Sequence, residues 1–359
     1  MGIRILLVAT AAETSVFDVY RGYRRALERA GHDVRVYDLN TYLKFYTRAF
    51  SIGKTEQQVS VIHPEQIMLA ATERVVTEAL LHQAELVLII SGLAFHPNIL
   101  ELLKRVHIPV AVVLTECPYD DEPQLKFAEL CDWAFVNDKA SLPKFQEVTQ
   151  AHYLPAAHDP EVHRMVPIQV GQDASDVLMV ATWFPERVEF FSQINWDGVR
   201  LKLYGPCVTD DKKAMPWPKE HVLSPYYGGI MVDNHDIAAL YATTKIGINI
   251  HRRHPRGYSL NPRTYELAAC GCFQLCDDTR PELQEIFGDS VPTFGSAREL
   301  EDKIHYYLAH DRARQDCIAK AIRAVQPHTF DARVEAMMSA IQRKGEGAGG
   351  LRLIFSRKE

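Results

Sequence analysis

The chain has 359 residues, 47% of them hydrophobic and 24% charged, which is the composition of an ordinary globular protein. This length exceeds the size at which a single hydrophobic core usually keeps growing, so two domains are expected. The formal net charge of −6 argues against a protein whose main work is to neutralise nucleic-acid phosphates.

The cysteines and the first residues indicate a cytoplasmic protein. The apolar start, residues 1–9, is too short to span a membrane and reads as a strand, and no later run reaches membrane length. Seven cysteines, an odd number, are typical of reduced thiols. Cys270, Cys272 and Cys276 follow a helix end and an apolar strand without a second CxxC pair, so we expect buried thiols and no metal.

The first half alternates apolar runs with amphipathic segments, the pattern of a parallel α/β sheet. No G-x-G-x-x-G follows the first strand, so no dinucleotide site is indicated there. Residues 41–61 lack a clear period and are expected to form a loop. Strands are expected at 3–9, 34–37, 86–91, 110–114, 133–137 and 152–154, and helices at 17–30, 64–83 and 99–106.

Polar side chains near strand ends are the functional candidates of this half. Residues 115–122 hold four carboxylates, including Asp120, that can bind hydroxyl groups or act as a base; a solvated acidic turn is an equal alternative. His158 lies beside an Asp-Pro turn and is either a ligand contact or a simple turn residue. Glu13 and Ser15 follow the first strand, where α/β folds bind ligands, although solvated loop residues would look the same.

The second half repeats the alternation after a polar linker at residues 169–176. Lys245 begins a strand whose Asn249 leads into a basic loop with Arg252 and Arg253, suited to phosphates or to a polyanion unless it is simply a solvated loop. His251 and His254 lack the spacing and further ligands of a metal site. Strands are expected at 177–181, 201–203, 246–250, 272–276 and 291–294, and helices after 187 and at 236–243, 262–270, 279–287, 296–309, 311–324 and 331–341.

Residues 259–287 are the most informative stretch. Asn261 suits a helix cap, Pro262 the first helical position and Gly271 the helix end. The free N–H groups and dipole of that helix start attract an anion, and Arg263 adds a planar charge suited to phosphate. Thr279, three residues before a glutamate, predicts a capping box for the next helix.

The run N-P-R-x-x-E-x-A-A-C-G-x-x-Q-L within this stretch resembles the donor-binding segment of GT-B glycosyltransferases, especially the spore-maturation (CgeB-like) branch of the group 1 superfamily. The resemblance implies that Glu266 binds the ribose hydroxyls of a nucleotide-sugar donor and that Arg187 contacts its diphosphate. Tyr227, in the stretch 226–229, is expected near the nucleobase. A larger related group has a second glutamate where this chain has Tyr258.

The resemblance also implies the architecture: an α/β protein of GT-B fold, with two doubly wound Rossmann-like domains facing a central cleft. We expect an acceptor-side domain at residues 1–165, with the loop at 41–61 on that side, and a donor domain at 166–328. A terminal helix at 329–345 is expected to cross back to the first domain, followed by a tail at 346–359.

The implied activity is transfer of a sugar from a nucleotide-sugar, most often a UDP-sugar, to a hydroxyl acceptor, with retention and without metal or other cofactor. The acceptor can be a glycan, a metabolite, a protein or a hydroxylated DNA base. A sugar-nucleotide epimerase of GT-B-like fold and a non-catalytic nucleotide-sugar-binding protein remain alternatives. The expected catalytic residues are Arg187, Arg263, Asp120 and His158, and the expected donor-binding residues are Glu266, Asn261, Pro262, Asn249, Lys245, Tyr227 and Arg252.

Overall fold

The computed structural model describes residues 2–11, 15–52, 59–168, 174–206, 217–229 and 234–347. The chain divides into two compact units: Met1–Pro155 together with Phe330–Glu359 form the first unit, and Ala156–Thr329 the second. Each unit has its own parallel sheet with helices on both faces, so the predicted fold class of two Rossmann-like units is confirmed. Glu13, most of the predicted linker and residues 348–359 lie outside the described residues.

The sheet of the first unit has the strand order β2-β1-β5-β6-β7-β8, and its neighbours pair in parallel. Strands β5, β6 and β7 are buried at every position, which explains why they read as continuous apolar runs in the sequence. The strands are β1 (Arg4–Val8), β2 (Asp33–Tyr37), β5 (Leu86–Ile90), β6 (Val110–Val113), β7 (Trp133–Val136) and β8 (Gln150–Tyr153).

Helix α14 (Phe330–Gly347) belongs to the first unit and packs against α1 (Ser15–Arg29). The Phe330 ring meets Tyr23 edge-on at 5.0 Å, and Arg29 donates two hydrogen bonds of 2.7 and 2.8 Å to Asp331. The other helices that cover this sheet are α4 (Arg74–Leu81), α5 (Asn98–Arg105), α6 (Asp121–Ala128) and α7 (Leu142–Gln146).

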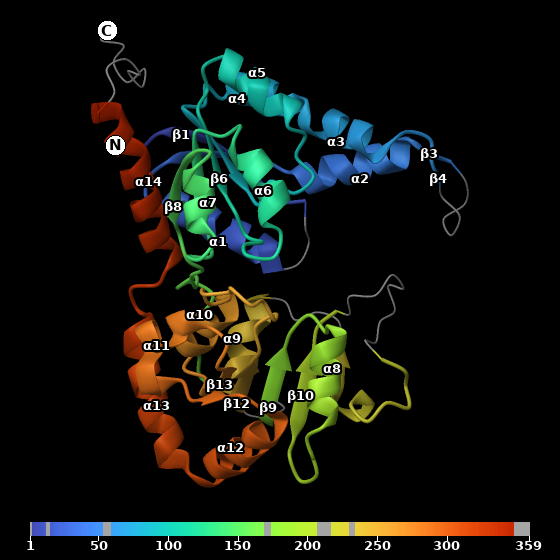
Figure 1. Cartoon of the computed structure of the whole chain (residues 1–359), viewed down its shortest axis with the longest axis vertical. Helices are drawn as coiled ribbons and strands as arrows, with labels where there is room; N and C mark the ends of the chain where they lie inside the picture. The colour runs from blue at the N-terminus through green and yellow to red at the C-terminus, as the bar shows by residue number, and fades with distance from the viewer. Residues whose placement is uncertain are drawn as a thin grey trace. The chain divides into compact units, whose positions relative to one another are not determined.

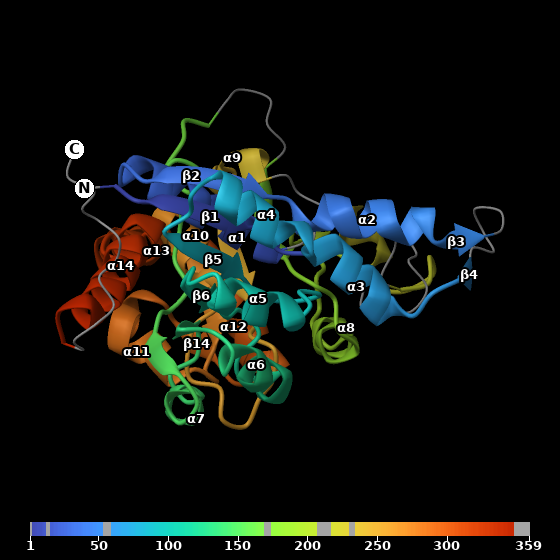
Figure 2. The same cartoon turned by 90° about the horizontal axis from the view of Figure 1, so that it is seen from above.

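The stretch at residues 41–61 was expected to be a loop, but its first part, up to Ala49, is helical. Helices α2 (Leu39–Ala49) and α3 (Pro64–Thr72) lie side by side and are joined through the hairpin of β3 (Ser51–Ile52) and β4 (Val59–Ser60), as Figures 1 and 2 show. Asp38 caps α2, and Tyr42 stacks on Tyr37 at 4.8 Å. Leu39, Tyr42, Leu43 and Tyr46 lie on one face of α2 at helical spacing and pack on the core of the first unit, a period that the sequence reading missed.

The helix expected at residues 64–83 is broken into α3 and α4. Glu73 is the last cap of α3 and the first cap of α4, so the chain changes direction there without leaving helical backbone angles.

The sheet of the second unit has the order β11-β10-β9-β12-β13-β14, again parallel throughout. The strand order reverses between β9 and β12, and α/β sheets bind ligands at the carboxyl ends of the strands at such a point. The strands are β9 (Ser175–Val180), β10 (Leu201–Tyr204), β11 (Tyr227–Gly229), β12 (Thr244–Asn249), β13 (Gln274–Asp277) and β14 (Thr293–Phe294).

The helices of the second unit cover the two faces of its sheet. One core cluster includes residues of α8 (Pro185–Ser192) and α12 (Ala297–Ala309). Two further clusters include residues of α9 (Asn234–Ala242), α10 (Pro262–Ala269), α11 (Pro281–Phe287) and α13 (Asp311–Val325). Across the described parts of the chain, no helix combines the length and the apolar character needed to cross a membrane.

Candidate functional site

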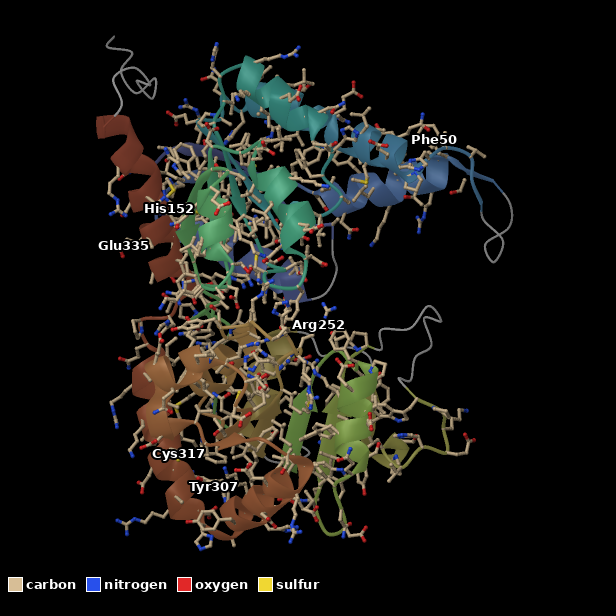
Figure 3. The ribbon with its side chains drawn as sticks, in the orientation of Figure 1. Phe50, His152, Arg252, Tyr307, Cys317 and Glu335 are labelled. Carbon is tan, nitrogen blue, oxygen red and sulfur yellow. The ribbon has the colours of Figure 1, made fainter. Side chains whose placement is uncertain are left out.

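The candidate site lies where the strands of the second unit end. The loops after β9, β12 and β13 meet at this edge, and α10 begins there. Figure 3 labels Arg252, an exposed residue of the loop after β12, at the edge toward which the arrows of β9 and β10 point in Figure 1. This edge is the switch point at which doubly wound sheets bind ligands.

The start of α10 has the capped form that the sequence predicts, and hydrogen bonds to Asn249 hold it in place. The Asn261 side chain accepts a hydrogen bond from the Thr264 backbone N at 3.1 Å, and Pro262 occupies the first turn. Asn249 and Asn261 exchange amide hydrogen bonds of 3.1 and 2.9 Å. Asn249 is fully buried, and its side chain supports the helix start.

The capping box predicted for the next helix is wrong, because the structure uses its two members elsewhere. Arg280 is the N-cap of α11 and makes no side-chain cap. The Thr279 hydroxyl donates to Asp277, and the Glu282 carboxylate accepts from the Leu260 backbone N at 2.8 Å. Glu282 therefore anchors the segment that leads into α10, a task that local spacing does not reveal.

A buried imidazole links the α10 start to a carboxylate. His251 Nδ1 donates to Asp277 Oδ1 at 2.6 Å, and the Asn261 backbone N donates to His251 Nε2 at 3.2 Å. Burial lowers the pKa of His251 although Asp277 opposes this, so the ring is neutral. Burial acts to raise the pKa of Asp277, but the hydrogen bonds from His251 and Thr279 and the electrostatic interaction with His251 together outweigh it. The pKa is therefore lowered, and Asp277 is ionised.

His251, Cys276 and Asp277 bring three possible metal ligands within 4.8 Å of one another. Both ring nitrogens of His251 already take part in hydrogen bonds, and burial raises the pKa of the Cys276 thiol. A metal in this cluster would have to displace the hydrogen bond between His251 Nδ1 and Asp277 Oδ1, because the Cys276 sulfur lies on the same side of the ring. The cluster is therefore explained as a hydrogen-bonded chain that orients this helix.

Arg187 connects two of the loops at the site. Its guanidinium donates to the Thr182 carbonyl and to the Ile250 carbonyl, each at 2.6 Å, and the residue is only 7% exposed. The guanidinium also lies 5.1 Å from the centre of the Phe184 ring, with Arg252 5.3 Å from the same ring. Arg187 therefore joins the loops after β9 and β12 through its hydrogen bonds.

Arg263 and Glu266 lie one turn apart on α10, and both are half-buried. Both interact electrostatically with Tyr241 on α9. The sequence did not single out the nearest histidine: His163 Nε2 lies 3.9 Å from Glu266 Oε1, and its Nδ1 accepts from the Asp159 backbone N at 3.0 Å. The feature of the sequence that could have indicated His163 is its four-residue spacing from Asp159.

Two predicted donor-binding residues lie apart from this group. Lys245 is at the amino end of β12, where it pairs with Asp176 at 2.9 Å; hydrogen bonds from Arg200 and then Lys245 lower the pKa of Asp176. Tyr227 is in the edge strand β11 and not in a loop, and it donates to the Gly205 carbonyl at 2.9 Å.

The remaining candidates are His158 and Asp120. His158 is buried in the second unit, where it bridges to Thr329, and burial lowers its pKa to about 4. Asp120 is exposed in the first unit just before α6, whose first turn takes in Asp121 and Glu122. Part of the acidic stretch is thus a helix start, where acidic side chains are favoured by the dipole.

A pocket that is open to solvent lies beside the same edge. It lies between α8 and the ends of β12, β13 and β14. Its lining residues are Glu186, Arg187, Phe190, Ile250, His251, Arg253, Asp277, Asp278, Thr279, Phe294 and Gly295.

Comparison with known proteins gives three findings. The model of the family described as "Glycosyl transferase-like" matches residues 187–339. The spore protein CgeB of Bacillus subtilis (strain 168) is 26% identical over 262 residues, which are 67% of this chain and 77% of CgeB.

Among solved structures, sucrose-phosphate synthase of Thermosynechococcus elongatus aligns over 96% of this chain and all of its own, with a TM-score of 0.65 at 13% identity. HepE of Anabaena, solved with UDP and glucose, aligns over 95% of this chain and all of its own, with a TM-score of 0.59 at 12% identity. The fold, the family match and the relative agree: the chain has the GT-B fold, its residues 187–339 match a glycosyl transferase-like family, and it is similar to CgeB.

Proposed function

We propose that the second unit binds a nucleotide-sugar, with the diphosphate at the start of α10 and the ribose at Glu266. The observation that carries the proposal is the position of Arg263 and Glu266 one turn apart, at the capped helix start, on the switch-point edge of the sheet. HepE, which shares the fold, was solved with UDP and glucose, and we propose a UDP-sugar as donor here.

The positive groups of the site support a reaction without a metal ion. Arg252 and Arg253 are exposed in the loop beside the α10 start, Arg263 is on its first turn, and the helix dipole adds partial positive charge. Negative charge grows on the diphosphate as the bond to the sugar breaks, and fixed positive groups stabilise that charge. His251 is neutral and therefore adds no charge to these positive groups.

The resemblance to group 1 enzymes supports retention of anomeric configuration. The bond from the anomeric carbon to the diphosphate oxygen breaks, the acceptor oxygen bonds to that carbon, and the acceptor proton passes to the leaving phosphate oxygen. No protein base is needed for this step. The acceptor is a hydroxyl group on a glycan, a metabolite, a protein or a DNA base, and the reaction is placed in the cytoplasm, in keeping with the free cysteines of the described residues.

The test is nucleoside diphosphate release from UDP-, GDP-, ADP- and TDP-sugars without acceptor, in buffer with and without EDTA. We expect release from a UDP-sugar at a rate that EDTA leaves unchanged. Arg263→Ala should slow it at least about tenfold, the effect of one charge-assisted hydrogen bond. Arg298→Ala, which removes an exposed arginine of α12, is the matched control and should leave the rate unchanged. Release from none of the donors, or equal rates in both variants, would contradict the proposal.

A further inference from the structure

We propose that His163 is a positioning residue of the donor site: its Nε2–H holds one oxygen of the Glu266 carboxylate, so that the other oxygen is presented to the ribose. This role rests on the proposed function. His163 comes from the segment that opens the second unit, far from α10 in the sequence, and only the fold brings the two side chains together.

A tight turn fixes the imidazole and its proton. The His163 backbone N donates to the Asp159 carbonyl at 2.7 Å, and the Asp159 backbone N donates to His163 Nδ1 at 3.0 Å. The Glu161 backbone N donates to Asp159 Oδ1 at 3.0 Å, which closes the turn. Because Nδ1 accepts a hydrogen bond, a neutral ring carries its proton on Nε2, the atom that faces Glu266.

The same segment is packed firmly on α10. Val162 and Val166 join the core cluster that contains Leu267 and Cys270 of that helix. Met165 covers the end of the helix, where Gly271 has a φ of +69° and a Cβ would lie 3.1 Å from the Met165 side chain. His163 is only 4% exposed, so its ring cannot turn toward water.

The Nε2–H of His163 is a buried donor without a hydrogen-bond partner among the described residues. Glu266 Oε1, at 3.9 Å, is beyond hydrogen-bond length, but the Glu266 side chain is 16% exposed, and a change in its terminal torsion, which has broad minima, would close the gap. An unpaired buried N–H is costly, which favours the rotation that closes this gap. Once it is closed, one carboxylate oxygen is occupied and the other has a defined direction.

Two further polar atoms, one on α10 and one on α9, are in the same condition. Within the described residues, Arg263 Nε and the Tyr241 hydroxyl are buried without a hydrogen-bond partner. Tyr241 interacts electrostatically with both Arg263 and Glu266. Buried polar atoms without a partner need an explanation, and a ligand bound beside this carboxylate would provide one.

The experiment compares the binding of UDP, 2′-deoxy-UDP and 3′-deoxy-UDP by calorimetry. In the wild type, loss of the hydroxyl that Glu266 binds should weaken binding about tenfold, the value of one good hydrogen bond. Glu266→Ala should remove this discrimination. His163→Phe should reduce it to about twofold while leaving the affinity for the deoxy nucleotide unchanged, because an unheld carboxylate loses direction but not the rest of the site.

The controls separate positioning from folding. Val162→Ala removes packing from the same segment without touching Glu266 and should keep the tenfold discrimination. His163→Gln, which retains an N–H donor of similar reach, should restore part of it and serves as the deciding variant if His163→Phe does not fold. Full discrimination in the folded His163 variant, with its loss in Glu266→Ala, would overturn the role of His163 alone. No binding of any nucleoside diphosphate by the wild type would overturn the proposed function and this role with it.

Discussion

At the scale of single residues, the side chains of the site differ in burial and in the contacts they make. Asn249 and His251 are buried and their hydrogen bonds end on the α10 start. Arg252 is exposed, and Arg263 and Glu266 are half-buried. The residue types alone suggested binding for all of these residues, whereas burial and hydrogen bonding show that their contacts differ.

Arg187 gives a prediction that distinguishes these two kinds of work. Arg187→Lys keeps the charge but cannot bridge two carbonyls, because an ammonium lacks the planar fork of a guanidinium. We expect both Arg187→Lys and Arg187→Ala to lower the free energy of unfolding by about 2–4 kcal/mol and to slow donor hydrolysis similarly. If Arg187→Lys kept wild-type stability and activity, its role as a bridge between loops would be wrong. Denaturant unfolding and diphosphate release measure the two effects.

His158 predicts a dependence of stability on pH. Burial lowers its pKa from 6.5 to about 4, with His163, Asp159 and His328 as charged or titratable neighbours. Between about pH 6.5 and 4, His158 is therefore protonated in the unfolded chain but neutral in the folded chain. The free energy of unfolding falls as the pH drops through this range, by up to about 3 kcal/mol.

Denaturant unfolding at several pH values checks this dependence by comparing variants. His251, whose pKa is also lowered, contributes in the same direction, so the test is the difference between variants. His158→Phe should flatten the profile. His305→Phe, at an exposed position on α12, should leave it as in the wild type. Parallel profiles for wild type and His158→Phe would show that His158 does not titrate in this window.

At the scale of elements, α10 carries the candidate site and its local sequence specifies it well. The cap, the proline in the first turn and Gly271 after the end lie where the spacing predicts. Local rules suffice here because capping and positive φ depend on residues adjacent in the chain. They fail for α11, whose predicted capping pair is used in longer-range hydrogen bonds.

The cap of α10 can be tested against the cap of another helix in the same unit. Asn261→Ala removes the hydrogen bond to Thr264 N and the amide pair with Asn249, and should cost about 1–2 kcal/mol of stability. It should also raise the donor KM about tenfold, since the helix start is no longer held. Ser296→Ala removes the comparable cap of α12, and it should cost similar stability with an unchanged donor KM. Equal donor KM values in the two variants would show that the cap of α10 has no specific role in donor binding.

At the scale of the whole molecule, the last helix completes the first unit and not the one that precedes it in the chain. The contact is specific: a Cβ on Gly22 would lie 2.3 Å from the Phe330 ring, so the ring fits against bare backbone of α1. Residues at both ends of the described chain thus share one core, and stability of the first unit depends on a segment translated after the second.

Phe330→Ala tests this dependence. Loss of a buried aromatic ring should lower the stability of the first unit by about 3–5 kcal/mol. Hydrogen exchange should then be faster in β1 and β5 than in the wild type, with UDP affinity of the second unit preserved. Phe45→Ala, which removes a ring that is 60% exposed on α2, is the control and should change neither. Unchanged exchange in Phe330→Ala would show that α14 is dispensable for this core.

The sequence by itself determined the alternation of strands and helices, the two-domain class, the form of α10 and the resemblance that leads to a glycosyltransferase. These properties depend on periodicity, caps and a contiguous motif, all of which are local along the chain. The tertiary structure decided which contacts the side chains make: Arg187 with backbone carbonyls, Lys245 with Asp176 and His163 beside Glu266. Those assignments depend on contacts between residues distant in sequence, because burial and hydrogen-bond pairing are set only when the strands and helices pack.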